Sequence, residues 1–201
     1  MAGFRDFRGR RFVAIIGSRE PEAGILPILE DVGEALCDSN IAVTSGDADG
    51  CDKAGVRGAM RSSSWELTGA RVYLPWNGVR YKDETVRWAD GQVYFDATRF
   101  ENYAQAQELA LKARGSWEGL GRGGIAMHSR NPYQVLLDDL NTPVGSVIFW
   151  AKPVGNKGNV RGGTNTAVQI ARSRNIPLIN LATDEGMEKI LQYLKKKGKR
   201  T

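Results

Sequence analysis

Three turns that contain glycine and follow short apolar runs are the parts of this sequence whose residue types suit anion binding. In the clearest case, the apolar residues 41–44 run directly into Ser-Gly-Asp-Ala-Asp-Gly-Cys-Asp at positions 45–52. This order is typical of a strand, a tight turn and the start of a helix. Such a turn exposes backbone N–H groups at the positive end of the helix, where phosphate groups bind.

The other two turns have the same arrangement. Gly17-Ser18-Arg19 follows the apolar run 12–16, and Gly162-Gly163-Thr164-Asn165-Thr166 follows the apolar run 147–150 after a polar excursion. Open α/β sheets bind ligands at the carboxyl ends of their parallel strands. We therefore expect the three turns to form one site for an anion or a nucleotide. The alternative for each turn alone is an ordinary strand-to-helix connection.

Arg130 is the side chain with the strongest indication of a role in binding. It lies near the start of a segment with a helical pattern, beside His128 and Asn131. An arginine there can bind phosphate through two parallel hydrogen bonds; a surface ion pair is the alternative. His128 is the one histidine of the chain, and a capping or ligand-contact role suits it better than that of a general base. Arg19 and Arg161 are secondary candidates.

Several other chemistries are disfavoured by the residues present. One histidine and two distant cysteines do not make a zinc site. The acidic loop that starts at Asp47 lacks calcium spacing, because its twelfth position is Gly58 and not glutamate. No P-loop pattern occurs. We expect no metal and no cofactor.

The pattern around the turns predicts an α/β fold. Short β-branched runs alternate with amphipathic segments, which indicates a Rossmann-like parallel sheet with helices on both faces. We expect a single domain over residues 1–201, with an aromatic-rich insertion at 76–127 and basic tails at 1–11 and 195–201. The expected strands are 12–16, 41–44, 71–75, 146–150 and 177–181, and the expected helices are 23–38, 50–61, 128–140, 164–174 and 184–197.

The insertion is rich in aromatic residues, and its residues 100–114 have a helical pattern. Its aromatic side chains could stack on a base or cover the site. The alternative is that they form a small core of the insertion itself. They are Trp76, Tyr81, Trp88, Tyr94, Phe95, Phe100, Tyr103 and Trp117.

The net charge of +5 resides in the two tails, since residues 1–11 carry +3 and residues 195–201 carry +5, leaving −3 on the rest. Basic tails strengthen nonspecific attachment to nucleic acid; the alternative is that they are solvated, frayed ends. No apolar run approaches the roughly 20 residues that span a bilayer. The first residues do not read as a signal peptide, and two cysteines suit a reducing compartment. We therefore expect a cytoplasmic protein without a membrane partner.

Together, these residues resemble the SLOG superfamily, which includes DprA/Smf-like, Lonely Guy (LOG)-like and YspA/YpsA-like proteins. Gly17-Ser18-Arg19 is similar to its first-strand turn, and residues 45–52 match the DprA-like pattern S-G-x-A-x-G-x-D. Ser129-Arg130-Asn131 resembles the Arg-Asn step of DprA-like chains, and Gly162 to Thr166 resembles the last phosphate-binding turn. The resemblance spans residues 12–75 and 127–181. It implies a Rossmann-like sheet whose turns bind a nucleotide or nucleic-acid phosphates.

One departure bears on catalysis. LOG enzymes carry G-G-x-G-T-x-x-E, and here Asn165 replaces a glycine and Gln169 replaces the glutamate. A glutamine can bind a ribose hydroxyl, but it cannot hold negative charge beside an oxocarbenium-like centre. This argues against LOG-type hydrolysis, although an aspartate of the 47–52 loop could supply a carboxylate. Whether the protein is an enzyme stays open, and no catalytic residue is assigned.

Three functions follow, in this order. The first is a nucleotide-binding protein that senses or sequesters a nucleotide signal without turnover. The second is a DprA-like single-stranded DNA-binding protein in recombination, and the third is a hydrolase of nucleotide N-glycosidic bonds. The resemblance also implies a homo-oligomer. The candidate ligand-binding residues are Gly17, Ser18, Arg19, Ser45, Gly46, Asp47, Asp52, His128, Arg130, Asn131, Gly162, Gly163, Thr164, Asn165, Thr166 and Gln169.

Overall fold

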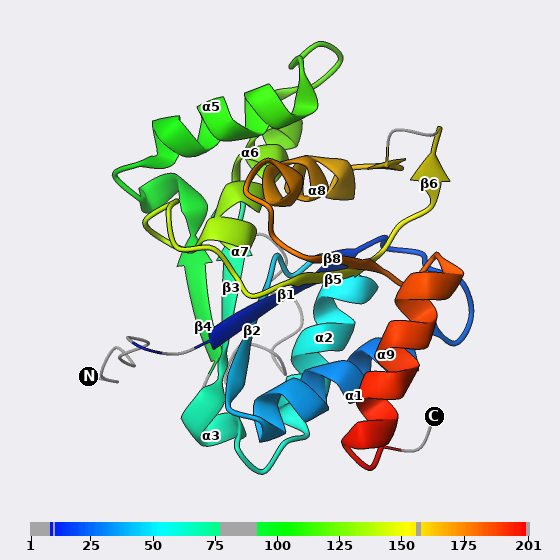
Figure 1. Ribbon diagram of the computed structural model, residues 1–201. Helices are drawn as coiled ribbons and strands as arrows, with labels where there is room; N and C mark the ends of the chain where they lie inside the picture. The colour runs from blue at the N-terminus through cyan, green and yellow to red at the C-terminus, as the bar shows by residue number, and fades with distance from the viewer. Residues whose placement is uncertain (1–8, 10, 77–91, 156–157, 200–201) are drawn as a thin grey trace.

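A six-stranded sheet forms the centre of the computed structural model, which describes residues 9, 11–76, 92–155 and 158–199 (Figure 1). Its strand order is β4-β3-β2-β1-β5-β8, and every neighbouring pair is parallel. The expected Rossmann-like architecture is confirmed. The strands are β1 (Arg11–Gly17), β2 (Ile41–Ser45), β3 (Ala70–Leu74), β4 (Gln92–Asp96), β5 (Val147–Trp150) and β8 (Leu178–Asn180).

Helices cover both faces of the sheet (Figure 1). One face carries α1 (Ile25–Asp38), α2 (Cys51–Met60) and α9 (Asp184–Lys196). The other carries α5 (Tyr103–Arg114), α6 (Arg122–Ser129), α7 (Asn131–Leu136) and α8 (Thr164–Ser173). The smaller elements are α3 (Trp65–Thr68), the 3-10 turn η1 (Ala97–Arg99) and a hairpin of β6 (Pro153–Val154) and β7 (Asn159–Val160).

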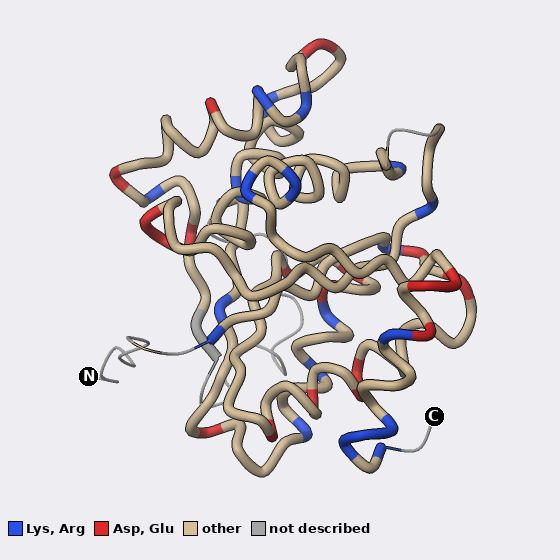
Figure 2. Tube along the Cα trace, viewed as in Figure 1, with Lys and Arg blue, Asp and Glu red and all other residues tan. Residues whose placement is uncertain are grey.

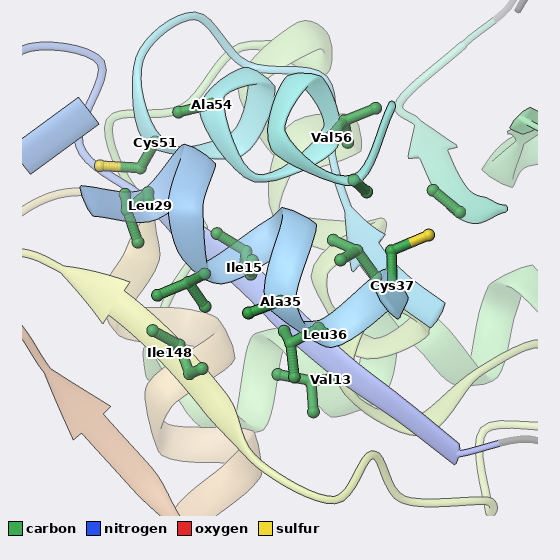
Figure 3. Packing of buried hydrophobic residues seen from close by; sticks show 14 of the residues in the cluster. Val13, Ile15, Leu29, Ala35, Leu36, Cys37, Cys51, Ala54, Val56 and Ile148 are labelled. Atoms are coloured by element: carbon green, nitrogen blue, oxygen red, sulfur yellow. The ribbon is translucent and has the colours of Figure 1, made fainter. Parts of the chain in front are cut away.

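Strand β1 shows why its sequence is apolar throughout. Its side chains alternate between two cores, because successive residues of a strand point to opposite faces. Val13 and Ile15 pack with Leu29 and other residues of α1 and α2 (Figure 3). Phe12 and the other alternate residues pack with α7 and α8. A parallel strand buried on both faces therefore needs a continuous apolar run.

The segment from β4 to α6 belongs to this sheet and its helical layer, although we assigned it to an insertion at 76–127. Strand β4 extends the sheet beside β3, with Leu74 opposite Asp96. The aromatic side chains of this segment pack with Tyr73 and Tyr133, which are fully buried, at ring-centroid distances of 4.8–6.3 Å. The residues of this aromatic cluster are Tyr73, Phe95, Phe100, Tyr103 and Tyr133. Tyr81 and Trp88, also assigned to the insertion, lie outside the described residues.

The helix expected at 128–140 is wrong. The chain instead forms α6 and α7, which meet at Arg130, and α7 ends at Leu136. Pro132 has no N–H to continue the hydrogen-bond ladder of α6, but it is well tolerated in the first turn of a new helix. The break places Arg130 at a corner between two helices.

The described basic residues near the two chain ends lie at the amino-terminal edge of the sheet. Arg11 begins β1. Lys199 forms ion pairs with Glu34 and Asp38 of α1, at 2.6 and 3.3 Å, so it is not a solvated end. Figure 2 shows a cluster of basic residues at this end of the chain. Within the described ranges, no helix is both long and apolar enough to cross a membrane.

Candidate functional site

A cleft of about 750 Å³ lies at the carboxyl ends of β1 and β5. The chain order of the sheet reverses between these neighbouring strands, and open α/β sheets bind ligands at such a switch point. The candidate residues that line the cleft are Gly17, Ser18, Arg19, Asp52, His128, Arg130, Asn131, Gly162, Gly163 and Thr164. The candidates outside its lining are Ser45, Gly46, Asp47, Asn165, Thr166 and Gln169.

The first two turns are joined to each other by Asp52. Its Oδ1 accepts a hydrogen bond from the Gly17 N–H at 3.0 Å, and its Oδ2 accepts one from the Gly46 N–H at 3.1 Å. Ser45 Oγ donates to the carbonyl oxygens of Ile15 and Asp52, at 3.0 and 3.1 Å. The conserved-looking spacing of Ser45, Gly46 and Asp52 therefore serves contacts between strand ends.

Asp52 also pairs with Arg130 below the cleft. Arg130 Nη2 lies 3.9 Å from Asp52 Oδ2, and the two side chains are 11% and 4% exposed. Arg130 Nη1 donates to the Tyr73 carbonyl oxygen at 3.2 Å. Burial raises the pKa of the Asp52 carboxyl, while Arg130 and then the Gly17 and Gly46 amides act to lower it. Arg130 is thus in a buried ion pair, which differs from the surface pair considered as the alternative.

Glycine is required at position 46 by this packing. A Cβ atom there would lie 2.0 Å from Gln134 Nε2 and 2.4 Å from the Arg130 guanidinium. Gly50, at φ +81°, faces the first turn in the same way, because a Cβ would lie 2.4–2.5 Å from the carbonyl oxygens of Ser18 and Arg19. Protein atoms therefore fill the space beside the second turn.

The third turn, at the start of α8, is open by contrast. No atom lies within 4 Å of the position that a Cβ would take at Gly162, and at Gly163 the nearest is His128 Cε1 at 3.8 Å. The Gly163 carbonyl oxygen accepts from Asn131 Nδ2 at 3.2 Å, which fixes the turn to α7. The amides of Gly163 and Thr164 have no acceptor inside the helix, because the first turn of a helix lacks preceding carbonyl groups.

His128 lies on the wall of the cleft, in the last turn of α6 and not at a helix start as expected. Its Nδ1 is 2.8 Å from Thr166 Oγ1 of α8. Burial, followed by the charges of Arg114 and Arg130, lowers the pKa of His128. The neutral imidazole therefore joins α6 to α8, and the Trp117 ring lies 6.3 Å from it.

Gln169 belongs to a polar network on another side of α8. Its Nε2 donates to Asn159 Oδ1 and Asn165 Oδ1 at 3.0 and 3.1 Å, and its Oε1 accepts from Arg172 at 3.2 Å. Asn165 Oδ1 also accepts from the Val160 N–H at 3.1 Å. These two candidates hold the β6–β7 hairpin to α8 and do not line the cleft.

The cleft is lined by cationic side chains that the sequence indicated only in part. Arg19, Arg130 and Arg161 were candidates, but Lys152 was missed. Its signal was a cation two residues after the apolar run that forms β5. Apolar side chains such as Leu120 and Met127 form part of the wall, and nothing in their local pattern predicts that position. The carboxylates in the lining are Glu20 and Asp52.

Comparison with known proteins confirms the resemblance to the DprA branch. The model of the family DNA recombination-mediator protein A matches residues 1–68. The structure is similar to DNA processing protein A from Helicobacter pylori, with TM-score 0.52 and 16% identity over 93% of this chain and 73% of that chain. That protein is described as having a unique single-stranded DNA binding mode.

A second solved structure, DNA processing protein A from Streptococcus pneumoniae, aligns with TM-score 0.46 and 14% identity, over 95% of this chain and 57% of that chain. A comparison with curated protein sequences gives no match. At these identities the structural similarity concerns the fold.

Proposed function

We propose that this chain, whose fold and first 68 residues resemble DNA processing protein A, binds single-stranded DNA at the cleft. The observation that carries the proposal is the set of four cationic side chains in the lining: Arg19, Arg130, Lys152 and Arg161. Their natural ligand is a phosphate-rich chain, since phosphate contacts dominate affinity for nucleic acids. This reverses the order given from the sequence, in which a nucleotide signal came first.

Three of the four cations are placed to meet a ligand. Arg130 is engaged by Asp52, which leaves Arg19, Lys152 and Arg161 for external phosphates. Lys152 lies 3.7 Å from Glu22 in an exposed pair, and such pairs contribute little, so phosphate can replace that partner. Beside them, the start of α8 supplies amides and a favourable helix dipole.

The cleft, and not the basic tails, is the proposed contact. The described tail residues Arg11 and Lys199 lie at the opposite edge of the sheet, and Lys199 is bound by Glu34 and Asp38. Binding that depended on the tails would therefore engage a different surface from the one that carries the three turns.

Bases have a nearby platform at Trp117, which lies against His128 on the cleft wall. Aromatic side chains stack on bases of any sequence, which suits binding without sequence preference. The aromatic cluster around Tyr73 and Tyr133 is internal, so it is not available for this purpose.

A small nucleotide is the second candidate ligand, and the size of the cleft favours it. A volume of about 750 Å³ lies within the range of roughly 300–1,000 Å³ that is usual for small-molecule sites. Hydrolysis has weaker support, since Gln169 is outside the lining and Asp52 is bound by two amides and an arginine. Burial also raises the pKa of Cys51 to about 12, which keeps this thiol protonated.

The experiment that tests the proposal is fluorescence anisotropy with a labelled oligothymidylate over a series of salt concentrations, with mononucleotides as competitors. We expect oligonucleotide binding that weakens steeply with salt, with about 0.7 in log–log slope for each phosphate contact. Binding of mononucleotides alone, with little dependence on salt, would support the second candidate. Binding of neither ligand would contradict both.

A further inference from the structure

The first two turns present their amides to a side chain of the protein itself. The Gly17 N–H and the Gly46 N–H, which end β1 and β2, donate to the two different oxygens of Asp52. Both oxygens act as acceptors, as they do in an ionised carboxylate and as a protonated carboxyl group cannot fully do. The Arg130 guanidinium supplies the compensating positive charge. Two amides and an arginine around one anion are the arrangement that would otherwise hold a phosphate.

The glycines support the same conclusion independently. Beside Gly17, a Cβ atom would lie 2.7 Å from the Trp150 carbonyl oxygen and 2.9 Å from Cys51, and beside Gly46 it would meet Gln134 and Arg130. These two glycines allow close contact with protein atoms. Gly162 of the third turn faces open space.

We propose that Asp52 is a built-in anion, which occupies the position that the first two turns would offer to a ligand phosphate and holds the Arg130 guanidinium in place. The cleft then has no phosphate position at these two turns. The three turns are therefore not equivalent, although their sequences are similar. This proposal does not depend on which ligand the cleft binds.

Removing the carboxylate should create an anion site, and formate is the probe that replaces the missing group. In Asp52→Ala, formate can enter from the cleft, because Asp52 is part of its lining. We expect the Tm of this variant to rise saturably with formate, by about 2–4 °C at roughly five times the Kd, relative to chloride at equal ionic strength. Wild type should not show this rise. Asp49→Ala is the matched control, since the Asp49 side chain is 59% exposed in a pair with Lys53.

Asp52→Asn adds a second control, because its amide group keeps the space filled and should prevent the formate effect. The proposal is overturned when folded Asp52→Ala responds to formate no more than wild type and Asp49→Ala do. Should Asp52→Ala fail to fold in chloride, its refolding yield is measured in formate. Recovery in formate supports the proposal, and failure in both salts contradicts it. Because no DNA is used, these outcomes are independent of the oligonucleotide experiment.

Discussion

Asp52 and Arg130 form an ion pair beneath the cleft, with Oδ2 and Nη2 3.9 Å apart. Asp52 ends the S-G-x-A-x-G-x-D pattern, and Arg130 belongs to the Arg-Asn step at the junction of α6 and α7. The two segments that carry the resemblance to DprA-like chains are thus in direct contact. Asn131, the next residue, extends this contact to the third turn through the Gly163 carbonyl oxygen.

Breaking this pair from one side should be costly. Arg130→Gln leaves the Asp52 carboxylate buried without its counter-charge, and we expect a loss of about 3–5 kcal/mol in the free energy of unfolding. The double variant Asp52→Asn/Arg130→Gln should lose clearly less than the sum of the two single variants. Urea denaturation measures all three. The exposed pair of Arg57 and Glu30 serves as the control, with an expected coupling of about 0.2–1 kcal/mol. Additive losses at Asp52 and Arg130 would show that the pair is not coupled.

Arg161→Ala should weaken binding of single-stranded DNA and reduce the salt dependence by about 0.7 in log–log slope, because one phosphate contact is lost. Arg174→Ala is the matched control, as Arg174 is an exposed arginine at the far end of α8. Equal effects of the two substitutions would locate binding away from the cleft. Anisotropy titrations at several salt concentrations measure both quantities.

Trp117→Ala should weaken binding of an oligothymidylate by about 1–3 kcal/mol, the usual contribution of one base stacked on an aromatic ring. The same substitution should leave binding of an abasic oligonucleotide unchanged, since that ligand keeps its phosphates and lacks bases. An equal loss with both ligands would mean that Trp117 acts through the structure of the cleft wall and not through stacking.

Gly46→Ala should destabilise the fold by about 1–3 kcal/mol, the usual cost of inserting a methyl group into a filled space. Here the new Cβ would meet Gln134 and Arg130. Gly121→Ala is the control, because a Cβ there meets no atom within 4 Å and φ is −77°, so the change should stay within about 0.5 kcal/mol. Thermal unfolding separates the two. A Gly46→Ala variant as stable as Gly121→Ala would contradict the packing described for the second turn.

Stability should fall when the pH drops below the ordinary pKa of histidine. Burial and the charges of Arg114 and Arg130 lower the pKa of His128 in the folded chain. The unfolded chain, with a pKa of about 6.5, therefore binds a proton at a higher pH than the folded chain does. Since the unfolded state binds more protons in this window, the free energy of unfolding decreases as the pH falls from about 6.5 toward the folded-state pKa.

His128→Gln should remove this part of the pH dependence, because the chain has no other histidine. Urea denaturation of wild type and His128→Gln at several pH values on both sides of about 6.5 provides the comparison. Parallel curves for the two proteins would show that His128 does not cause the loss.

The sequence by itself determined the strands, most of the helices and the location of the three turns. These features depend on local patterns: apolar runs such as 12–16 and 41–44, helical spacing, and glycine at the turns. Because parallel strands end at the same edge, these patterns also predicted that the turns would meet. The DprA-like resemblance was likewise visible in the sequence, and the comparisons confirm it.

Only the tertiary structure decided what each turn does. Whether an amide at the end of a strand binds a ligand or a side chain depends on which acceptor reaches it, and Asp52 reaches both Gly17 and Gly46. The direction of Gln169 and the position of Lys152 depend in the same way on how α8 and the β6–β7 hairpin pack. Such contacts join residues far apart in the chain, and no local pattern encodes them.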